Sequence, residues 1–87
     1  MIEEKELRVM NANCGEFGYW KNNQGTYTAL CLMSPTAKYF VGNKYKTLTE
    51  AKQAFIQKQE YWNEKNRNEG MRTCDYETLI SENEKEG

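Results

Sequence analysis

The stretch from residue 25 to residue 62 constrains the fold most strongly, because it reads as two strands followed by a helix. A run rich in apolar and β-branched residues covers 26–33, and a second strand-like run covers 37–42. Between them stands Ser34-Pro35-Thr36. Proline cannot donate a hydrogen bond to a strand ladder, so the connection between the two strands is expected at Pro35. Gly42-Asn43 is expected to end the second strand.

The helix that follows is predicted by its N-terminal cap. Thr47 can accept a hydrogen bond from the backbone N–H of Glu50, and Glu50 can reach back to Thr47, in a capping box that contributes about 1 kcal/mol. The helical period then gives an apolar stripe that is predicted to pack on the sheet: Leu48, Ala51, Ala54, Phe55, Tyr61 and Trp62. Ile56 falls outside this stripe and is expected at the surface. The helix is expected to run to Arg67, with Gly70 as its stop signal.

Two flanking segments complete the predicted fold. Residues 16–21 alternate loosely, although Gly18 interrupts the pattern, and the Asn- and Gly-rich residues 21–25 predict a turn back into the strand at 26–33. Residues 7–10 are a candidate further strand. Thr73 can cap a short second helix that runs through Ser81, with Tyr76, Leu79 and Ile80 on one side. The sequence therefore predicts an α+β fold: an antiparallel meander of three strands, or four with residues 7–10, packed on one amphipathic helix, with a short C-terminal helix.

Length and cysteine content indicate one small domain in a reducing compartment. The chain has 87 residues, which suits a single α+β domain over residues 1–81 with a frayed acidic tail at 82–87. No apolar run approaches the ~20 residues that a membrane-spanning helix needs. Cys14, Cys31 and Cys74 are an odd number at unrelated spacings, which favours reduced thiols in a cytoplasmic protein over a disulfide framework.

The residues that usually carry chemistry are missing from the sequence. It contains no histidine, so a cysteine nucleophile would lack its usual imidazole and general-base chemistry would fall to Asp, Glu or Lys. Residues 15–18, Gly-Glu-Phe-Gly, lack the spacing and the Lys-Ser/Thr ending of a phosphate-binding loop. We therefore expect a protein that is not an enzyme and that has no catalytic residues, no bound metal and no cofactor.

Charge is distributed unevenly along the chain. Residues 1–16 carry a net charge of −2, residues 17–58 carry six lysines against one glutamate for a net +5, and residues 59–87 carry four basic against eight acidic residues for a net −4. One interpretation is that solvated charges have clustered by chance. The other is a bipolar molecule that orients a charged partner during encounter.

A binding role follows from the small size, the absent catalytic groups and the abundant Tyr, Trp and Asn. Tyr and Trp are enriched among the residues that dominate binding energy at protein interfaces. We expect a phage or mobile-element protein that inhibits a larger host protein, one that handles nucleic acid or acts in defence, by occluding a basic surface. The expected contacts are exposed aromatic residues near the 18–25 turn together with acidic residues of the helix and tail: Tyr19, Trp20, Glu60, Glu64, Asp75 and Glu77.

Duplex DNA binding is the alternative, and it comes from a family resemblance that covers fewer than half of the residues. The segments GTYTA at 25–29, KYFVG at 38–42 and YKTLTEA at 45–51 resemble the module of three strands and a helix at the N-terminus of tyrosine-family integrases. The resemblance implies that the sheet enters the major groove of DNA. It also implies that basic and aromatic side chains of the sheet touch the DNA, at positions matching Tyr19, Lys21, Tyr27, Lys38 and Tyr39.

Overall fold

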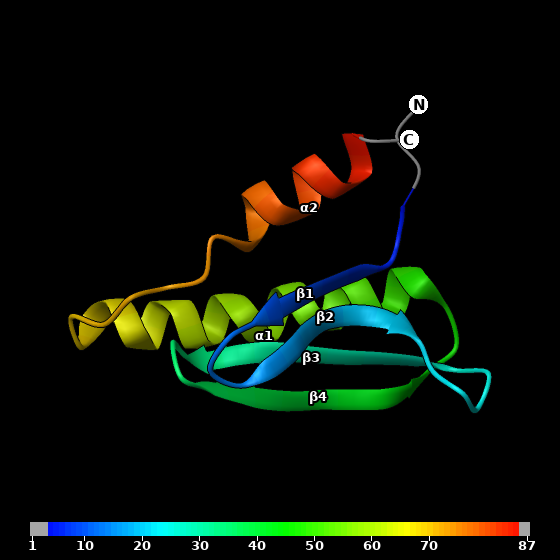
Figure 1. The fold of residues 1–87 in the computed structure, drawn as a ribbon, viewed down its shortest axis with the longest axis horizontal. Coiled ribbons are helices and arrows are strands. Elements are labelled where there is room, and N and C mark those ends of the chain that lie inside the picture. Colours follow the sequence, from blue (N-terminus) through cyan, green and yellow to red (C-terminus); the bar gives the residue numbers. More distant parts are fainter. Residues whose placement is uncertain (1–3, 86–87) are drawn as a thin grey trace.

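A computed structural model describes residues 4–85 as one antiparallel sheet and two helices (Figure 1). The elements are β1 (Leu7–Asn11), β2 (Gly15–Lys21), β3 (Tyr27–Ser34), β4 (Ala37–Tyr45), α1 (Leu48–Asn68) and α2 (Tyr76–Lys85). The strands lie in the order β1-β2-β3-β4, so that each strand pairs with its neighbour in the chain. The predicted α+β meander is confirmed, and residues 7–11 do form a fourth strand.

The register of β2 assigns side chains to the two faces of the sheet. Tyr19 lies opposite both Leu7 and Ala29, and its ring contacts Phe55 of α1, so this face looks toward the helices. Successive side chains of a strand point to opposite faces, so Trp20 points to the outer face. Both helices are therefore on the Tyr19 face, because α2 reaches the same Phe55 ring through Tyr76.

Gly18 lets β1 approach β2 closely. Its φ is +132°, and a Cβ at this position would lie 2.0 Å from the carbonyl oxygen of Leu7. Only glycine fits this conformation and this distance. The interruption that Gly18 makes in the sequence pattern is thus the feature that allows the fourth strand to pair.

β4 is longer than predicted. It continues past Gly42-Asn43 to Tyr45, which pairs with Tyr27 beyond two register shifts. The Tyr45 ring folds back over Gly42, where a Cβ would come within 2.8 Å of the Tyr45 hydroxyl oxygen. Gly42 therefore makes room inside the strand for this ring instead of ending the strand.

The core lies between the sheet and the first half of α1. Ala51 and Phe55 are fully buried, and the Phe55 ring centroid lies 5.4 Å from that of Tyr19 and 6.2 Å from that of Tyr76. The cap predicted at Thr47 is confirmed, because its hydroxyl oxygen accepts from the backbone N–H of Glu50 at 3.1 Å. The predicted packing of this half of the helix on the sheet is therefore correct.

The second half of the buried face of α1 is polar, which the apolar stripe did not predict. Its buried residues are Gln59, Asn63 and Asn66, whereas Tyr61 is 53% exposed. Ile56 is half-buried against the core and not at the surface, because its side of the helix faces α2. The buried face of α1 does follow the helical period, but the predicted stripe wrongly included Tyr61, which lies at the edge of that face.

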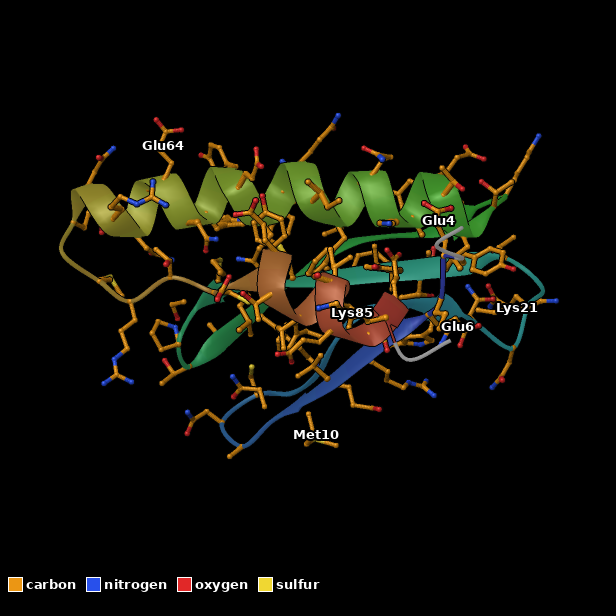
Figure 2. All side chains as sticks on the ribbon, turned by 90° about the horizontal axis from the view of Figure 1, so that it is seen from above. Glu4, Glu6, Met10, Lys21, Glu64 and Lys85 are labelled. Carbon is orange, nitrogen blue, oxygen red and sulfur yellow. The ribbon has the colours of Figure 1, made fainter. Side chains whose placement is uncertain are left out.

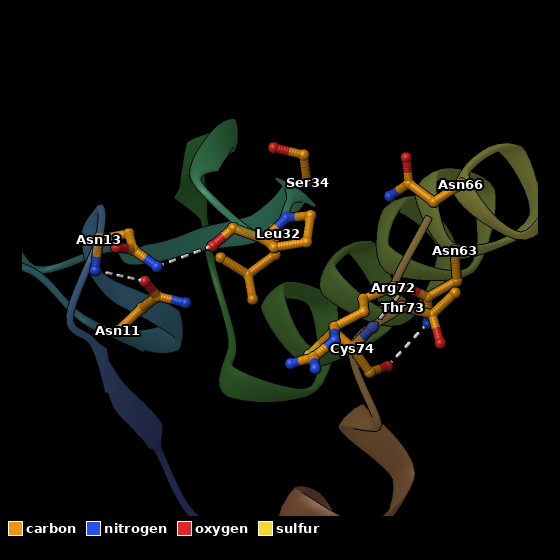
Figure 3. A pocket seen from close by; sticks show the side chains of 10 residues that line it. Asn11, Asn13, Leu32, Ser34, Asn63, Asn66, Arg72, Thr73 and Cys74 are labelled. Carbon is orange, nitrogen blue, oxygen red and sulfur yellow. Dashed lines mark hydrogen bonds between the residues drawn. The ribbon is translucent and has the colours of Figure 1, made fainter. Parts of the chain in front are cut away.

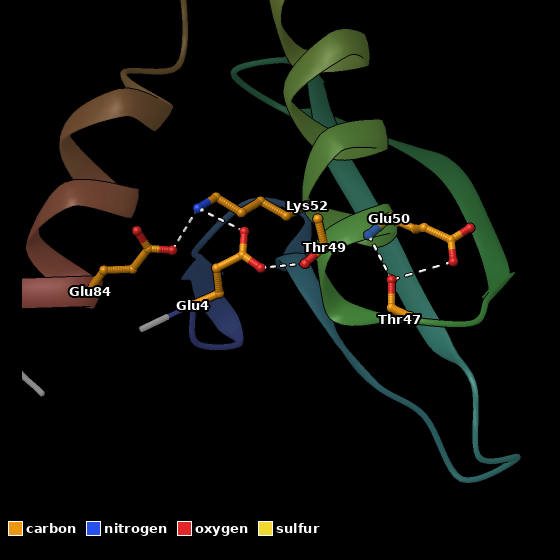
Figure 4. Close-up of polar contacts among 6 residues, drawn as sticks. All are labelled: Glu4, Thr47, Thr49, Glu50, Lys52 and Glu84. Atoms are coloured by element: carbon orange, nitrogen blue, oxygen red, sulfur yellow. Dashed lines mark hydrogen bonds and ion pairs between the residues drawn. The ribbon is translucent and has the colours of Figure 1, made fainter. Parts of the chain in front are cut away.

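α2 begins and ends later than predicted. Asp75, and not Thr73, caps its first turn by accepting from the backbone N–H of Thr78 at 3.4 Å. The helix continues past Ser81 to Lys85, so residues 82–85 are helical and not a frayed tail, and residues 86–87 lie outside the described part. In this last turn the Glu84 carboxylate lies 2.7 Å from Nζ of Lys52 in α1 (Figure 4).

Neither helix described within residues 4–85 is long and apolar enough to cross a membrane.

Candidate functional site

Four of the predicted contact residues line one cleft between the C-terminal half of α1 and the start of α2. We call it the acidic cleft, and its volume is about 380 Å³. Its carboxylates come from two parts of the chain: Glu60 and Glu64 from α1, and Asp75 and Glu77 from the start of α2. Arg67 is the one basic residue among the described residues that line it. The cleft is therefore strongly negative and suited to a basic ligand.

Short polar contacts hold the two walls of the acidic cleft together. The amide of Asn63 donates to the carbonyl oxygen of Cys74 at 2.8 Å and accepts from its N–H at 2.9 Å, which fixes the chain before α2 against α1. Tyr76 is buried, and its hydroxyl donates to the Glu60 carboxylate. Burial, and then this bond to Glu60, raise the pKa of Tyr76, so the hydroxyl stays protonated and keeps its donor role at neutral pH.

Glu64 and Glu77 are the most available carboxylates of the cleft. Both residues are exposed, and the carboxylate of neither forms a hydrogen bond or ion pair with another residue in 4–85. Glu64 points away from the sheet (Figure 2). A partner can therefore pair with these two carboxylates without first breaking a contact inside the protein.

Tyr19 and Trp20 are not exposed, so the prediction that they form an aromatic contact surface is wrong. Tyr19 is 0% exposed and packs on Phe55, as the alternation of β2 requires. Trp20, on the outer face, is 9% exposed, and the guanidinium of Arg8 lies 4.6 Å from the centre of its ring. Both aromatic residues belong to the packing of β2, an internal strand of the sheet.

The exposed aromatic residue near the acidic cleft is Tyr61. Its ring centroid lies 5.1 Å from that of Trp62, at a nearly perpendicular angle, and the side chains of Lys58 and Lys65 lie over these two rings. Glu64 lines both the acidic cleft and an open pocket beside Tyr61. Tyr61 and the carboxylates therefore form one continuous surface around α1. The sequence does not indicate this surface, because Tyr61 fits the period of the predicted core stripe.

The residues implied by the integrase resemblance do not share one exposed face of the sheet. Tyr19 is buried, and Tyr39 lies opposite Cys31, on the face toward α1. Lys21 and Tyr27 lie opposite each other near the 21–27 turn and share the face of Tyr19 by strand alternation. Of the five residues, only Lys38 lies on the outer face, because it precedes Tyr39 in β4 and successive side chains alternate. The structure thus brings together the acidic residues of the first prediction but not the DNA-contacting set of the second.

No site for a metal ion is present among residues 4–85, since no three Cys, Asp or Glu side chains there lie close enough together to hold one. All three cysteines are free thiols. Burial raises the pKa of Cys31 to about 12 and that of Cys74 to about 11, so these two thiols are neutral at physiological pH and are poor nucleophiles.

Comparison with models of known protein families, with curated proteins and with solved structures finds no match for this chain.

Proposed function

We propose that this chain is a non-enzymatic protein-binding module that contacts a basic surface of a larger protein. The observation that carries the proposal is the convergence of Glu60, Glu64, Asp75 and Glu77 in one cleft beside the exposed ring of Tyr61. Tyr is enriched among the residues that dominate binding energy, and a polar, solvent-accessible rim usually surrounds such residues at protein interfaces.

The two parts of this surface have different roles in the proposed complex. Tyr61 supplies buried contact area, which mainly slows dissociation. The carboxylates meet lysine and arginine side chains of the partner, which mainly raises the association rate and discriminates among partners. Glu64 connects the two parts, since it lines the acidic cleft and the pocket at Tyr61.

We propose further that the partner is a nucleic-acid-handling or defence protein and that the chain, encoded by a phage or mobile element, inhibits it by occluding its surface in the cytoplasm. The support is chemical, because four carboxylates at a protein surface imitate the charge of a phosphate backbone. A protein whose basic groove binds phosphates presents the complementary surface. Three free thiols support a reducing compartment.

Affinity purification from the native cell tests this proposal. The tagged protein is captured after nuclease treatment, so that nucleic acid cannot bridge it to other proteins. We expect one protein partner in stoichiometric amount. Recovery of nucleic acid without a protein from a sample that was not treated with nuclease would contradict the proposal in favour of DNA binding.

A further inference from the structure

A second cavity lies where β2 and β3 separate at one end of the sheet (Figure 3). The pairing of β2 with β3 ends at Gly18 and Leu30, while β2 continues to pair with β1 as far as Gly15. The cavity left between them has a volume of about 280 Å³. This volume is just below the usual range of small-molecule sites, roughly 300–1,000 Å³, so the cavity suits a small ligand or the end of a chain.

Two amides of α1, Asn63 and Asn66, line the cavity and are held by hydrogen bonds to other parts of the fold. Asn66 donates to the carbonyl oxygen of Met33 at 3.0 Å, and Asn63 pairs with both backbone groups of Cys74. Gln59, which does not itself line the cavity, pairs with both backbone groups of Leu32. Buried amides with satisfied hydrogen bonds keep one geometry. The cavity is therefore a fixed feature of the fold.

The groups left for a ligand include one positive charge, free donors, and two acceptors without a partner in residues 4–85, the amide oxygens of Asn13 and Asn66. Arg72 is the one charged side chain among the described residues that line the cavity, and no carboxylate lines it. None of the hydrogen bonds or ion pairs within residues 4–85 uses the Arg72 guanidinium. Oδ1 of Asn11 accepts hydrogen bonds from the backbone N–H groups of Asn13 and Cys14, and the NH₂ group of Asn11 has no partner within residues 4–85. Ser34 and Thr73 add hydroxyl groups.

We propose that this cavity binds an oxyanion group, either a carboxylate or a phosphate. The guanidinium of Arg72 pairs with the two oxygens of such a group, as its planar fork of donors favours, and the free NH₂ group of Asn11, which points toward Arg72 (Figure 3), donates a further hydrogen bond. The group has two possible sources: the C-terminal carboxylate of a peptide or a phosphate-bearing small molecule. The acidic cleft shares Asn63, Thr73 and Cys74 with this cavity but carries the opposite charge, so it takes a different ligand.

An NMR titration of the intact, nitrogen-15-labelled chain tests this site with three probes. They are inorganic phosphate, an N-acetylated dipeptide with a free C-terminal carboxylate, and the same dipeptide with an amidated C-terminus. We expect saturable shifts at the backbone N–H groups of Thr73 and Cys74 and at the side-chain NH₂ group of Asn11. Saturation by phosphate identifies a phosphate ligand, whereas saturation by the free dipeptide but not by its amide identifies a chain end.

Two arginine variants provide the controls. Arg72→Gln removes the guanidinium from the cavity and should weaken binding by about tenfold or more, the loss expected for a charge-assisted hydrogen-bonded pair. Arg67→Gln removes the same charge from the acidic cleft and should leave the affinity unchanged. Both residues are exposed, so unchanged spectra away from the substitution verify folding. Shifts that never saturate with any probe, or equal affinity in Arg72→Gln and wild type, overturn the proposal.

Discussion

The side-chain amide of Gln59 in α1 pairs with the backbone of Leu32 in β3 as a neighbouring strand would. Its Nε2 donates to the Leu32 carbonyl oxygen at 2.9 Å, and its Oε1 accepts from the Leu32 N–H at 3.0 Å. The pairing of β3 with β2 ends at Leu30, so Gln59 satisfies backbone groups that β2 leaves without a partner. A buried amide therefore stands where the helical period alone would predict an apolar residue.

Replacing this amide tests how much the fold depends on it. Gln59→Leu keeps the size of the side chain but leaves two buried backbone groups unpaired, each at a cost of about 1–3 kcal/mol. The free energy of unfolding, measured with urea, should fall by about 2–5 kcal/mol. Gln57→Leu, at an exposed position of the same helix, is the matched control. A loss in Gln59→Leu no larger than in this control would show that the amide is dispensable.

Phe55 is expected to be the most sensitive position of the core. It is fully buried between Tyr19 and Tyr76, so Phe55→Ala should cost about 3–5 kcal/mol, enough to unfold a domain of this size. Thermal unfolding followed by circular dichroism measures the change. Tyr61→Ala removes an exposed aromatic ring from the same helix and should change stability by about 0.5 kcal/mol or less. Equal melting temperatures in the two variants would contradict this assignment of the core.

The Glu4 carboxylate is expected to make the stability of the fold depend on pH. Its carboxylate accepts from the Thr49 hydroxyl and lies 3.4 Å from Nζ of Lys52 (Figure 4), and these contacts, the Thr49 bond most, lower its pKa. The ionised form therefore stabilises the fold above the unfolded-state pKa of about 4.3, and this contribution is lost as the pH falls through the lower, folded-state value.

A comparison of melting temperatures across pH checks this dependence. Glu4→Gln should melt below the wild type at about pH 6, and the gap should close as the pH falls through the lowered folded-state pKa and the wild-type carboxyl also becomes neutral. Glu82→Gln, at an exposed position of α2, controls for the change in net charge. A gap between Glu4→Gln and wild type that stays constant across this range would contradict the role assigned to the Glu4 carboxylate.

Local patterns in the sequence predicted the strands and helices. Features that depend on tertiary contacts, such as the burial of certain residues, could not be predicted from these patterns. The cap at Thr47 and the turn at Pro35 depend on neighbouring residues, and both were predicted correctly. The burial of Gln59 depends on the separation of β2 from β3, which no local pattern records. The burial of Tyr19 depends on strand alternation around Gly18, where the pattern was weakest.

The candidate site was also predicted only in part. Clustering of acidic residues in the last third of the chain pointed to Glu60, Glu64, Asp75 and Glu77, which lie together because Asn63 and Tyr76 join α2 to α1. Their binding role stays a prediction. The exposed aromatic residue was predicted at Tyr19 and Trp20, whereas the structure exposes Tyr61. Which ring is exposed depends on which side of α1 the sheet leaves uncovered, and no local pattern shows this.

The role of Tyr61 can be measured in the kinetics of binding to the captured partner. Tyr61→Ala should hasten dissociation while leaving the association rate nearly unchanged, since truncation removes buried area and no charge. Phe40→Ala is the matched control, because Phe40 is an aromatic residue of similar exposure, 55%, on the outer face of the sheet. Faster dissociation in Phe40→Ala and not in Tyr61→Ala would move the interface to that face.

Reversing the charge of the acidic cleft tests whether the partner binds there. Affinity capture from the native cell is compared for the wild type, for Glu64→Lys with Glu77→Lys, and for Glu69→Lys with Glu82→Lys, which makes the same change of charge at exposed positions outside the cleft. We expect the wild type and the second pair to recover the same protein partner and the cleft pair to lose it. Equal recovery of that partner by both double variants would contradict binding through the acidic cleft.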